Sequence, residues 1–187
     1  MSRSLQNHSR TLRSKPPLLL TESQSDFDDL VASFGREIVP RGVIEQIYFD
    51  DIITSVWEIL RLRRCKTVIV NIAFKKALRA LLELQLDYDR AQELAERWFN
   101  DRAARTEVVG VLGELKLDET AIEAEAIRIS SANLDGIDRM LAAAESRRSR
   151  AFRNIEDCRA SFAKTIRNAS DSALQESGEP PTLQPQE

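Results

Sequence analysis

The sequence of 187 residues has few of the residues that punctuate or cross-link a fold. Its two cysteines, Cys65 and Cys158, exclude a disulfide-rich scaffold. Glycine and proline number six each, and no proline lies between Arg41 and Glu179. Sandwiches, barrels and tandem βαβ units need many tight turns, so this scarcity excludes them and favours long helices. We therefore expect an all-α fold.

Histidine is also scarce, since His8 is the only one in the sequence. Its isolation near the start argues against a Ser-His-Asp triad, a zinc site and a dimetal bundle, which needs two Glu-x-x-His pairs. No P-loop motif is present. Asp50 and Asp51 are adjacent on an expected helix and point about 100° apart, so they do not form a metal clamp by themselves. We expect no enzyme, no catalytic residue, no cofactor and no bound metal.

The charge balance excludes two further classes of protein. With 27 Lys and Arg against 30 Asp and Glu, the net charge is −3, and 42% of residues are hydrophobic. These values fit neither a strongly basic nucleic-acid protein nor an acidic disordered chain. No apolar run approaches the roughly 20 residues of a membrane helix. Residues 1–6 include a basic residue but no apolar stretch follows them, so we expect no secretory signal, no membrane contact and a cytoplasmic location.

The remaining residues divide the chain into a body and two tails. Residues 1–20 carry four basic residues and no acidic one, and we expect a basic flexible tail there. Residues 21–170 are expected to form a single elongated helical domain, and residues 171–187, rich in Ser, Gln and Pro, a disordered tail. The first helix is predicted to start at Ser23, which lies three residues before Asp26 as in a capping box, and to end at residues 39–42.

Two heptad seams are the clearest pattern in the body. The first predicts a helix over residues 43–86, roughly 65 Å long, and the second a helix over 135–168, roughly 50 Å long. The seam positions are Ile53, Val56, Leu60, Arg63, Thr67, Val70, Phe74, Ala77, Leu81 and Leu84 in the first helix, and Leu134, Ile137, Leu141, Ala144, Arg148, Ala151, Ile155, Cys158, Phe162, Thr165 and Ala169 in the second. We expect the two helices to run antiparallel with Leu84 near Leu134, within one chain or between chains.

The insert between these helices, about residues 87–133, is expected to form three shorter helices, with Asp118 capping the third. It carries an excess of acidic residues, whereas residues 1–20 are basic. The acids Glu119, Glu123 and Glu125 lie near the start of that third helix, where the helix dipole favours them. Charge is therefore segregated along the chain, which suggests a partner surface.

Two basic clusters lie on the long helices. The first comprises Arg61, Arg63, Arg64 and Lys66, and the expected register places Arg61 opposite Asp157, so intramolecular salt bridges explain this cluster. The second comprises Arg147, Arg148, Arg150 and Arg153 and has fewer acids around it. The basic tail residues are Arg3, Arg10, Arg13 and Lys15. The tail and the second cluster are the candidate contacts for nucleic acid or another partner.

Several short runs resemble a known group of proteins. They are LLLTES (18–23), DF (26–27), EIVPRGVIE (37–45) and VWEILRLRR (56–64). Over about residues 7–85 the chain resembles a widespread group of uncharacterised bacterial proteins, nearest to those of rhizobial-type bacteria. That group has a basic Asn…His-Gly start and a long helix with Trp-x-x-x-Arg-x-x-Arg. Here Ser9 stands in place of the glycine. The resemblance implies no activity and no catalytic residue.

Three functional interpretations follow. The first is a non-enzymatic helical interaction or scaffold protein that binds a protein partner or itself. The alternative is a nucleic-acid-associated accessory protein that binds weakly through the basic tail and the arginine-rich helix. The third is an enzyme that uses carboxylates such as Asp50 and Asp51 with a metal ion.

Overall fold

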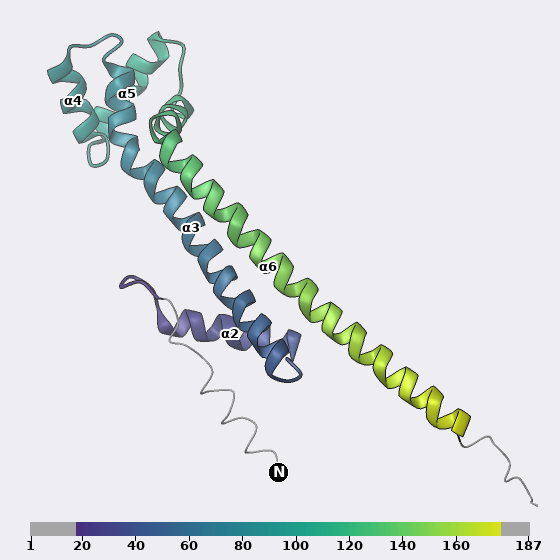
Figure 1. Cartoon of the computed structure of the whole chain (residues 1–187). Helices are drawn as coiled ribbons and strands as arrows, with labels where there is room; N and C mark the ends of the chain where they lie inside the picture. The colour runs from purple at the N-terminus through teal and green to yellow at the C-terminus, as the bar shows by residue number, and fades with distance from the viewer. Residues whose placement is uncertain (1–17, 177–187) are drawn as a thin grey trace, which may run out of the picture. The chain divides into compact units, whose positions relative to one another are not determined.

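The computed structural model describes residues 18–176 as α-helices joined by short connections, and contains no strand in that range. The helices are α2 (Gln24–Ile38), α3 (Val43–Leu82), α4 (Tyr88–Arg97), α5 (Arg102–Glu114) and α6 (Thr120–Glu176) (Figure 1). The all-α prediction is confirmed. Between residues 18 and 176, no helix is both long and apolar enough to cross a membrane. Residues 1–17 of the expected basic tail lie outside the described part of the chain.

The described chain divides into two compact units rather than the single domain expected over residues 21–170. Unit 1 contains residues 18–56 and 146–176, and unit 2 contains residues 57–145. Helices α3 and α6 each contribute one part to unit 1 and another to unit 2, so each unit has its own packing of α3 against α6 segments.

Helix α2 begins and ends where the sequence predicts. The side chain of Ser23 accepts a hydrogen bond from the backbone N–H of Asp26 at 3.2 Å, which satisfies one free donor of the first turn. Val39 ends the helix in the left-handed conformation with φ 44°. Phe27 is buried, while Phe34 and Ile38 pack partly buried against the rest of unit 1.

The core of unit 1 is small and joins three helices. Ile52 of α3 is fully buried against Ala151 and Ile155 of α6. Phe49 of α3 lies against Gly35 of α2, where a Cβ would be 3.9 Å from the phenyl ring. This packing holds α2 beside the start of α3 (Figure 1), and the order of the contacting residues makes α3 and α6 antiparallel in this unit.

Unit 2 has the larger core, at the junction of the end of α3, the α4–α5 pair and the start of α6. Its members are mostly alanine and branched aliphatic residues, with Trp98 as the one large aromatic residue in the buried set. The buried residues are Ala77, Leu78, Leu82, Ala91, Leu94, Ala95, Trp98, Ala104, Val108, Leu112, Ile122 and Ala126. Three of them are alanines at the α4 and α5 contact faces, which lets those helices pack closely.

The prediction of a separate third insert helix is wrong, because α6 is one helix of 57 residues from Thr120. Gly136 lies inside it without interrupting it. One glycine costs a helix about 1 kcal/mol, which the packing of Ile122, Leu134 and Ile137 offsets. The predicted disordered tail also begins too early, since residues 171–176 continue the helix; extending a formed helix avoids the cost of nucleation. Residues 177–187 lie outside the described chain.

The first seam is offset by one residue over part of α3. Ile59 and Leu62 are buried, whereas the predicted seam residue Leu60 is 42% exposed. One residue rotates a helical face by 100°, so the predicted stripe ran beside the packed face in this stretch. Helix α3 also ends at Leu82, and Leu84 lies in the following turn with 65% exposure rather than near Leu134.

Candidate functional site

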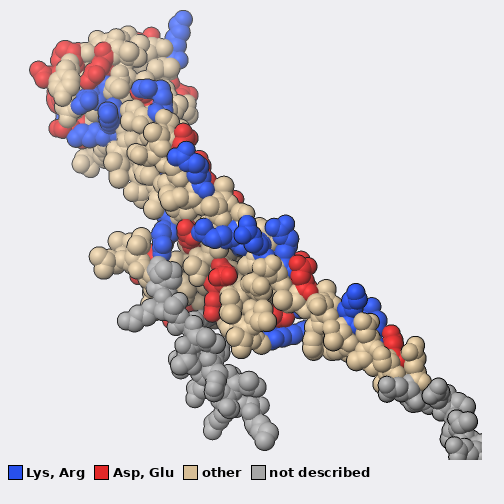
Figure 2. Space-filling view, viewed as in Figure 1, with Lys and Arg blue, Asp and Glu red and all other residues tan. Residues whose placement is uncertain are grey.

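The second basic cluster is divided among different faces of α6. Arg147 and Arg150 are three residues apart and lie on the face that also carries Asn154. Arg148 is half-buried on the seam side, and Arg153 is exposed. Basic side chains gather over the middle of α6 (Figure 2). Of the four arginines, the structure therefore places only Arg147 and Arg150 on one shared face of α6.

Arg147 and Arg150 line a groove of about 280 Å³ in unit 1, which we call the polar groove. Its α6 wall is completed by Ala151 and Asn154, and its α3 wall carries one carboxylate and three hydroxyl groups. The α3 residues are Tyr48, Asp51, Thr54 and Ser55. Helical spacing explains the set, because residues 48, 51 and 55 recur every three or four positions and share one face.

The two adjacent aspartates of α3 differ in their surroundings. Asp51 lines the polar groove, whereas the carboxylate of Asp50 accepts a hydrogen bond from the side chain of Gln46 at 3.0 Å. They therefore form no joint clamp in unit 1. More generally, no cluster of three metal-ligating side chains occurs among residues 18–176.

Arg159 is a structural centre that sequence reasoning missed. Its guanidinium donates to the carboxylate of Glu45 at 2.9 Å and to the backbone carbonyl of Ile38 at 2.7 Å. The backbone N–H of Arg41 donates to the same carboxylate at 2.9 Å. The Arg159 hydrogen bond lowers the pKa of Glu45 although burial opposes this, and Glu45 raises the pKa of Arg159 in turn. One arginine thus joins α6 to α3 and to the end of α2.

The first basic cluster takes part in intramolecular contacts, as predicted, but in another register. Arg63 pairs with Glu145 at 3.2 Å and Lys66 with Asp138 at 2.7 Å, both within unit 2. The guanidinium of Arg64 lies 5.8 Å from the ring centroid of Trp57. These two ion pairs show that the α3 and α6 segments of unit 2 pack antiparallel within the chain.

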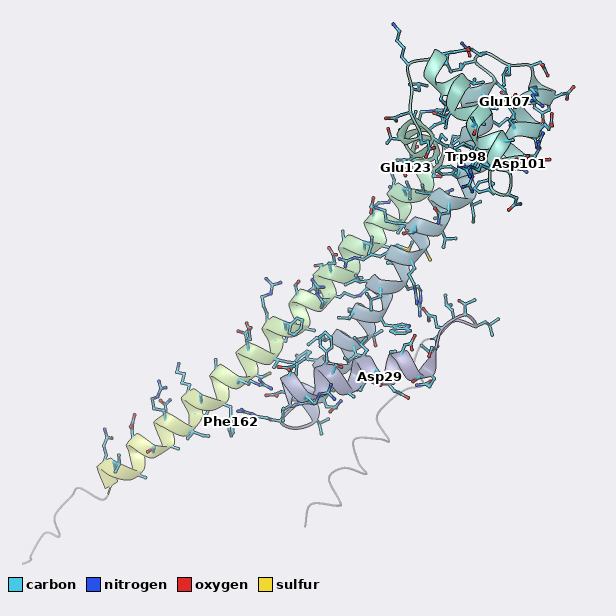
Figure 3. All side chains as sticks on the ribbon, turned by 180° about the vertical axis from the view of Figure 1, so that it is seen from behind. Asp29, Trp98, Asp101, Glu107, Glu123 and Phe162 are labelled. Carbon is cyan, nitrogen blue, oxygen red and sulfur yellow. The ribbon has the colours of Figure 1, made fainter. Side chains whose placement is uncertain are left out.

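The acidic insert neutralises many of its charges internally. Arg90 bridges Glu107 and Glu93, and Arg97 bridges Glu93 and Asp101, across and along α4 and α5. The Arg97 hydrogen bonds lower the pKa values of Glu93 and Asp101, with Arg90 adding to the effect at Glu93. Acidic and basic side chains are intermixed on this part of unit 2 (Figure 2), and Trp98, Asp101 and Glu107 all belong to it (Figure 3).

The other residues noted in the sequence fall into three groups: helix caps and ion pairs, free thiols, and residues outside the described range. Asp118 accepts from the backbone N–H of Thr120 at 2.9 Å, which confirms its capping role, although the helix it caps is α6 itself. Glu125 pairs with Arg128 on the first turns of α6. Cys65 and Cys158 are free thiols, each half-buried. The tail residues Arg3, Arg10, Arg13 and Lys15 and the histidine His8 lie outside the described residues.

The last part of α6 differs from the rest of the helix because every residue from 160 to 175 is exposed. Phe162 is 63% and Ile166 is 54% exposed. With Ala169 and Ala173 these residues recur at four, three and four positions, as in a heptad seam, and we call this set the terminal stripe. Lys164, Arg167 and Asp171 fall on the other side of the helix, so the stripe carries no charge. Phe162 lies on α6 beyond the turn between α2 and α3 (Figure 3).

Comparison with known proteins gives no family for this chain. No family model, no curated protein and no solved structure matches it.

Proposed function

We propose that this chain is a non-enzymatic helical interaction protein that associates with a second copy of itself through the terminal stripe. The observation that carries the proposal is the exposure of Phe162 and Ile166 in residues 160–175 of α6, where Lys164, Arg167 and Asp171 lie on the opposite side. Exposed apolar residues aligned at heptad spacing are the pattern by which helices pair.

The partner that best fits the terminal stripe is α6 of a second copy, because the stripe continues the face of α6 that already packs in unit 1. The stripe prolongs the face of α6 that packs through Ile155 and Arg159 onto α3 and α2. Helix α3 begins at Val43, close in register to Arg159, so beyond that point α6 runs on without α3. A helix of the same heptad pattern extends this packing most simply.

Side-chain size favours an antiparallel pair. When residue 162 lies opposite residue 173 of the partner, residue 166 lies opposite residue 169, and each large side chain meets an alanine. A parallel pair places Phe162 against Phe162 and Ala173 against Ala173, which forces the helices apart at one end and leaves a gap at the other. The antiparallel arrangement also sets the helix dipoles in opposition.

The length of the stripe sets the expected strength. Residues 160–176 span roughly 25 Å of helix, a little over two heptads. Two such helices bury less than the roughly 1,200 Å² of a standard stable interface. We therefore expect a weak, reversible dimer that forms in the micromolar range or above.

Sedimentation equilibrium of the full chain from about 10 µM to 1 mM tests the proposal. A rise in mean mass toward two chains is expected, and Ile166→Glu should abolish it. The matched control is Leu174→Glu, which adds the same charge to a residue that is 69% exposed but lies off the stripe. A monomer at every concentration, or equal effects of the two variants, would overturn the proposal.

Disulfide trapping then tests the antiparallel register. In a Cys65→Ser, Cys158→Ser background, mixed Phe162→Cys and Ala173→Cys chains should form the mixed disulfide in preference to either homodimer. A preference for the homodimers would instead assign a parallel pair and refute the antiparallel arrangement.

A further inference from the structure

The polar groove of unit 1 brings together polar side chains from α3 and α6. Within residues 18–176, no side-chain hydrogen bond or ion pair involves Tyr48, Asp51, Ser55, Arg150 or Asn154. Ser55 is only 4% exposed, and Tyr48 and Asn154 are half-buried. Asp51 and Arg150 are exposed, so water bonds to them in the empty groove, and a ligand with matching donors and acceptors can take the place of that water.

The chemistry of the two walls specifies that ligand. The α6 wall offers the guanidinium groups of Arg147 and Arg150 and the amide of Asn154, a donor set suited to a phosphate. The α3 wall offers hydroxyl groups and the carboxylate of Asp51, which as an anion only accepts hydrogen bonds. A simple anion would be repelled by the carboxylate of Asp51. The matching ligand has a phosphate on one side and a free hydroxyl on the other.

The volume limits the size of that ligand. At about 280 Å³ the groove lies just below the roughly 300–1,000 Å³ range of ordinary ligand pockets. It therefore holds one sugar and one phosphate rather than a whole dinucleotide. We propose that the polar groove binds a ribose phosphate, with the arginines on the phosphate and Asp51 accepting from a ribose hydroxyl.

Two sources share this chemistry, namely free ribose 5-phosphate and one nucleotide of an RNA strand. In RNA the 2′-hydroxyl supplies the donor for Asp51, and DNA lacks it, so the groove should prefer RNA over DNA of the same length. The basic residues Arg3, Arg10, Arg13 and Lys15 add attraction for any polyanion. That attraction acts on RNA and DNA alike. The ratio of RNA affinity to DNA affinity, and the affinity for ribose 5-phosphate, are therefore better tests of the groove than the affinity for RNA alone.

Titration of the full chain with labelled oligouridylate and oligothymidylate of equal length, at about 50 and 150 mM salt, is the first measurement. Calorimetry with ribose 5-phosphate, with inorganic phosphate as reference, is the second. We expect tighter binding of RNA than DNA, or of ribose 5-phosphate than inorganic phosphate, and the ligand that binds identifies the source. Equal binding within both pairs, or no binding, would overturn the proposal.

Variants tie the binding to the groove. Arg150→Gln should weaken binding about tenfold or more, whereas Arg153→Gln, the same change on an exposed residue outside the groove lining, should change it less than about threefold. Asp51→Asn should remove the preference for ribose while leaving phosphate binding intact. Ser55→Ala provides a second groove variant with little change in volume. Equal losses at Arg150 and Arg153, in variants with unchanged circular dichroism, would contradict a built site. The site does not depend on the terminal stripe, so dimer failure leaves it testable.

Discussion

Replacing Arg159 with methionine should loosen unit 1 while leaving unit 2 unchanged. Arg159→Met keeps much of the aliphatic length of the side chain but removes the guanidinium that contacts Glu45 and the carbonyl oxygens of Ile38 and Val39. These contacts join α6 to α3 and to the end of α2. The Glu45 side chain, 8% exposed, would then retain only the backbone N–H of Arg41.

The size of the effect follows from this geometry. Removing one partner of a fully buried ion pair costs about 3–5 kcal/mol, because the other charge stays buried without compensation. The Arg159 side chain is 33% exposed, so water screens part of the interaction. We therefore expect the opening free energy of unit 1 to fall by about 2–4 kcal/mol at pH 7. In Glu45→Met, Arg159→Met the carboxylate is gone as well, and the loss should be smaller than in Arg159→Met.

Hydrogen exchange measured by mass spectrometry resolves the two units separately, which a single denaturation curve does not. Amides of residues 24–38 and 43–56 should lose protection, and those of residues 88–114 should not. Arg153→Met, on the same helix but exposed, is the matched control. If protection in α2 falls by less than about 0.5 kcal/mol, or if the double variant loses more than Arg159→Met, the assignment of Arg159 as the centre of unit 1 is refuted.

Two further predictions concern backbone strain and pH. Lys116 has φ 59° just after α5, where the N–H of Leu117 donates to the carbonyl of Leu112 at 2.9 Å. Glycine adopts this conformation without strain, so Lys116→Gly should raise the free energy of unfolding by about 0.5–1 kcal/mol in urea denaturation. A lower free energy of unfolding would contradict the strain argument. Carboxyl groups such as Glu45 and Asp101 have pKa values lowered by arginine partners, so their contribution is complete above their ordinary pKa and is lost as pH falls through the lower folded value. The urea midpoint should therefore be constant near neutral pH and should decrease once the pH is lower than about 4.5. The decrease should be less steep in Glu45→Gln. A midpoint that stays unchanged down to about pH 3 would show that these ion pairs contribute nothing to stability.

Helix ends were predictable wherever a local signal determines them. Ser23 and Asp118 act as expected because a cap needs only its own side chain and the next few backbone N–H groups. The end of α3 at Leu82 was not predictable from the seam, since apolar spacing continues to Leu84. There the chain turns so that α4, capped by Asp87, packs into unit 2.

The face of a helix was harder to predict than its existence. Residues 57–70 contain apolar side chains on two adjacent stripes, and both have heptad spacing. Only tertiary packing decides that Ile59 and Leu62 are buried while Leu60 is 42% exposed. The same limit applies to the candidate site: the run from Arg147 to Arg153 is visible in the sequence, but the residues of α3 that form the other wall of the groove are determined by tertiary packing.

The predicted register of α3 against α6 was wrong for a related reason. Apolar heptads rich in alanine and threonine pack almost equally well after a shift of one heptad, so a periodic seam leaves register weakly specified. Ion pairs between specific positions remove this degeneracy, because a shifted register would separate Lys66 from Asp138 by a full heptad. Within unit 2 that pair and Arg63–Glu145 specify one alignment, and within unit 1 the buried Glu45–Arg159 pair does so.

In the packed segments apolar residues supply the contact and charged residues specify the register. The terminal stripe differs because it has only the apolar residues. Each packed α3–α6 segment combines apolar contacts with at least one cross-helix ion pair. The terminal stripe has the apolar repeat of Phe162 and Ile166 but no charge on its packing face. Its register is therefore specified only by the fit of large side chains against alanines. An interface of that kind is expected to be weak and reversible, and substitution of Ala169 with a larger residue should disturb it as strongly as loss of Phe162.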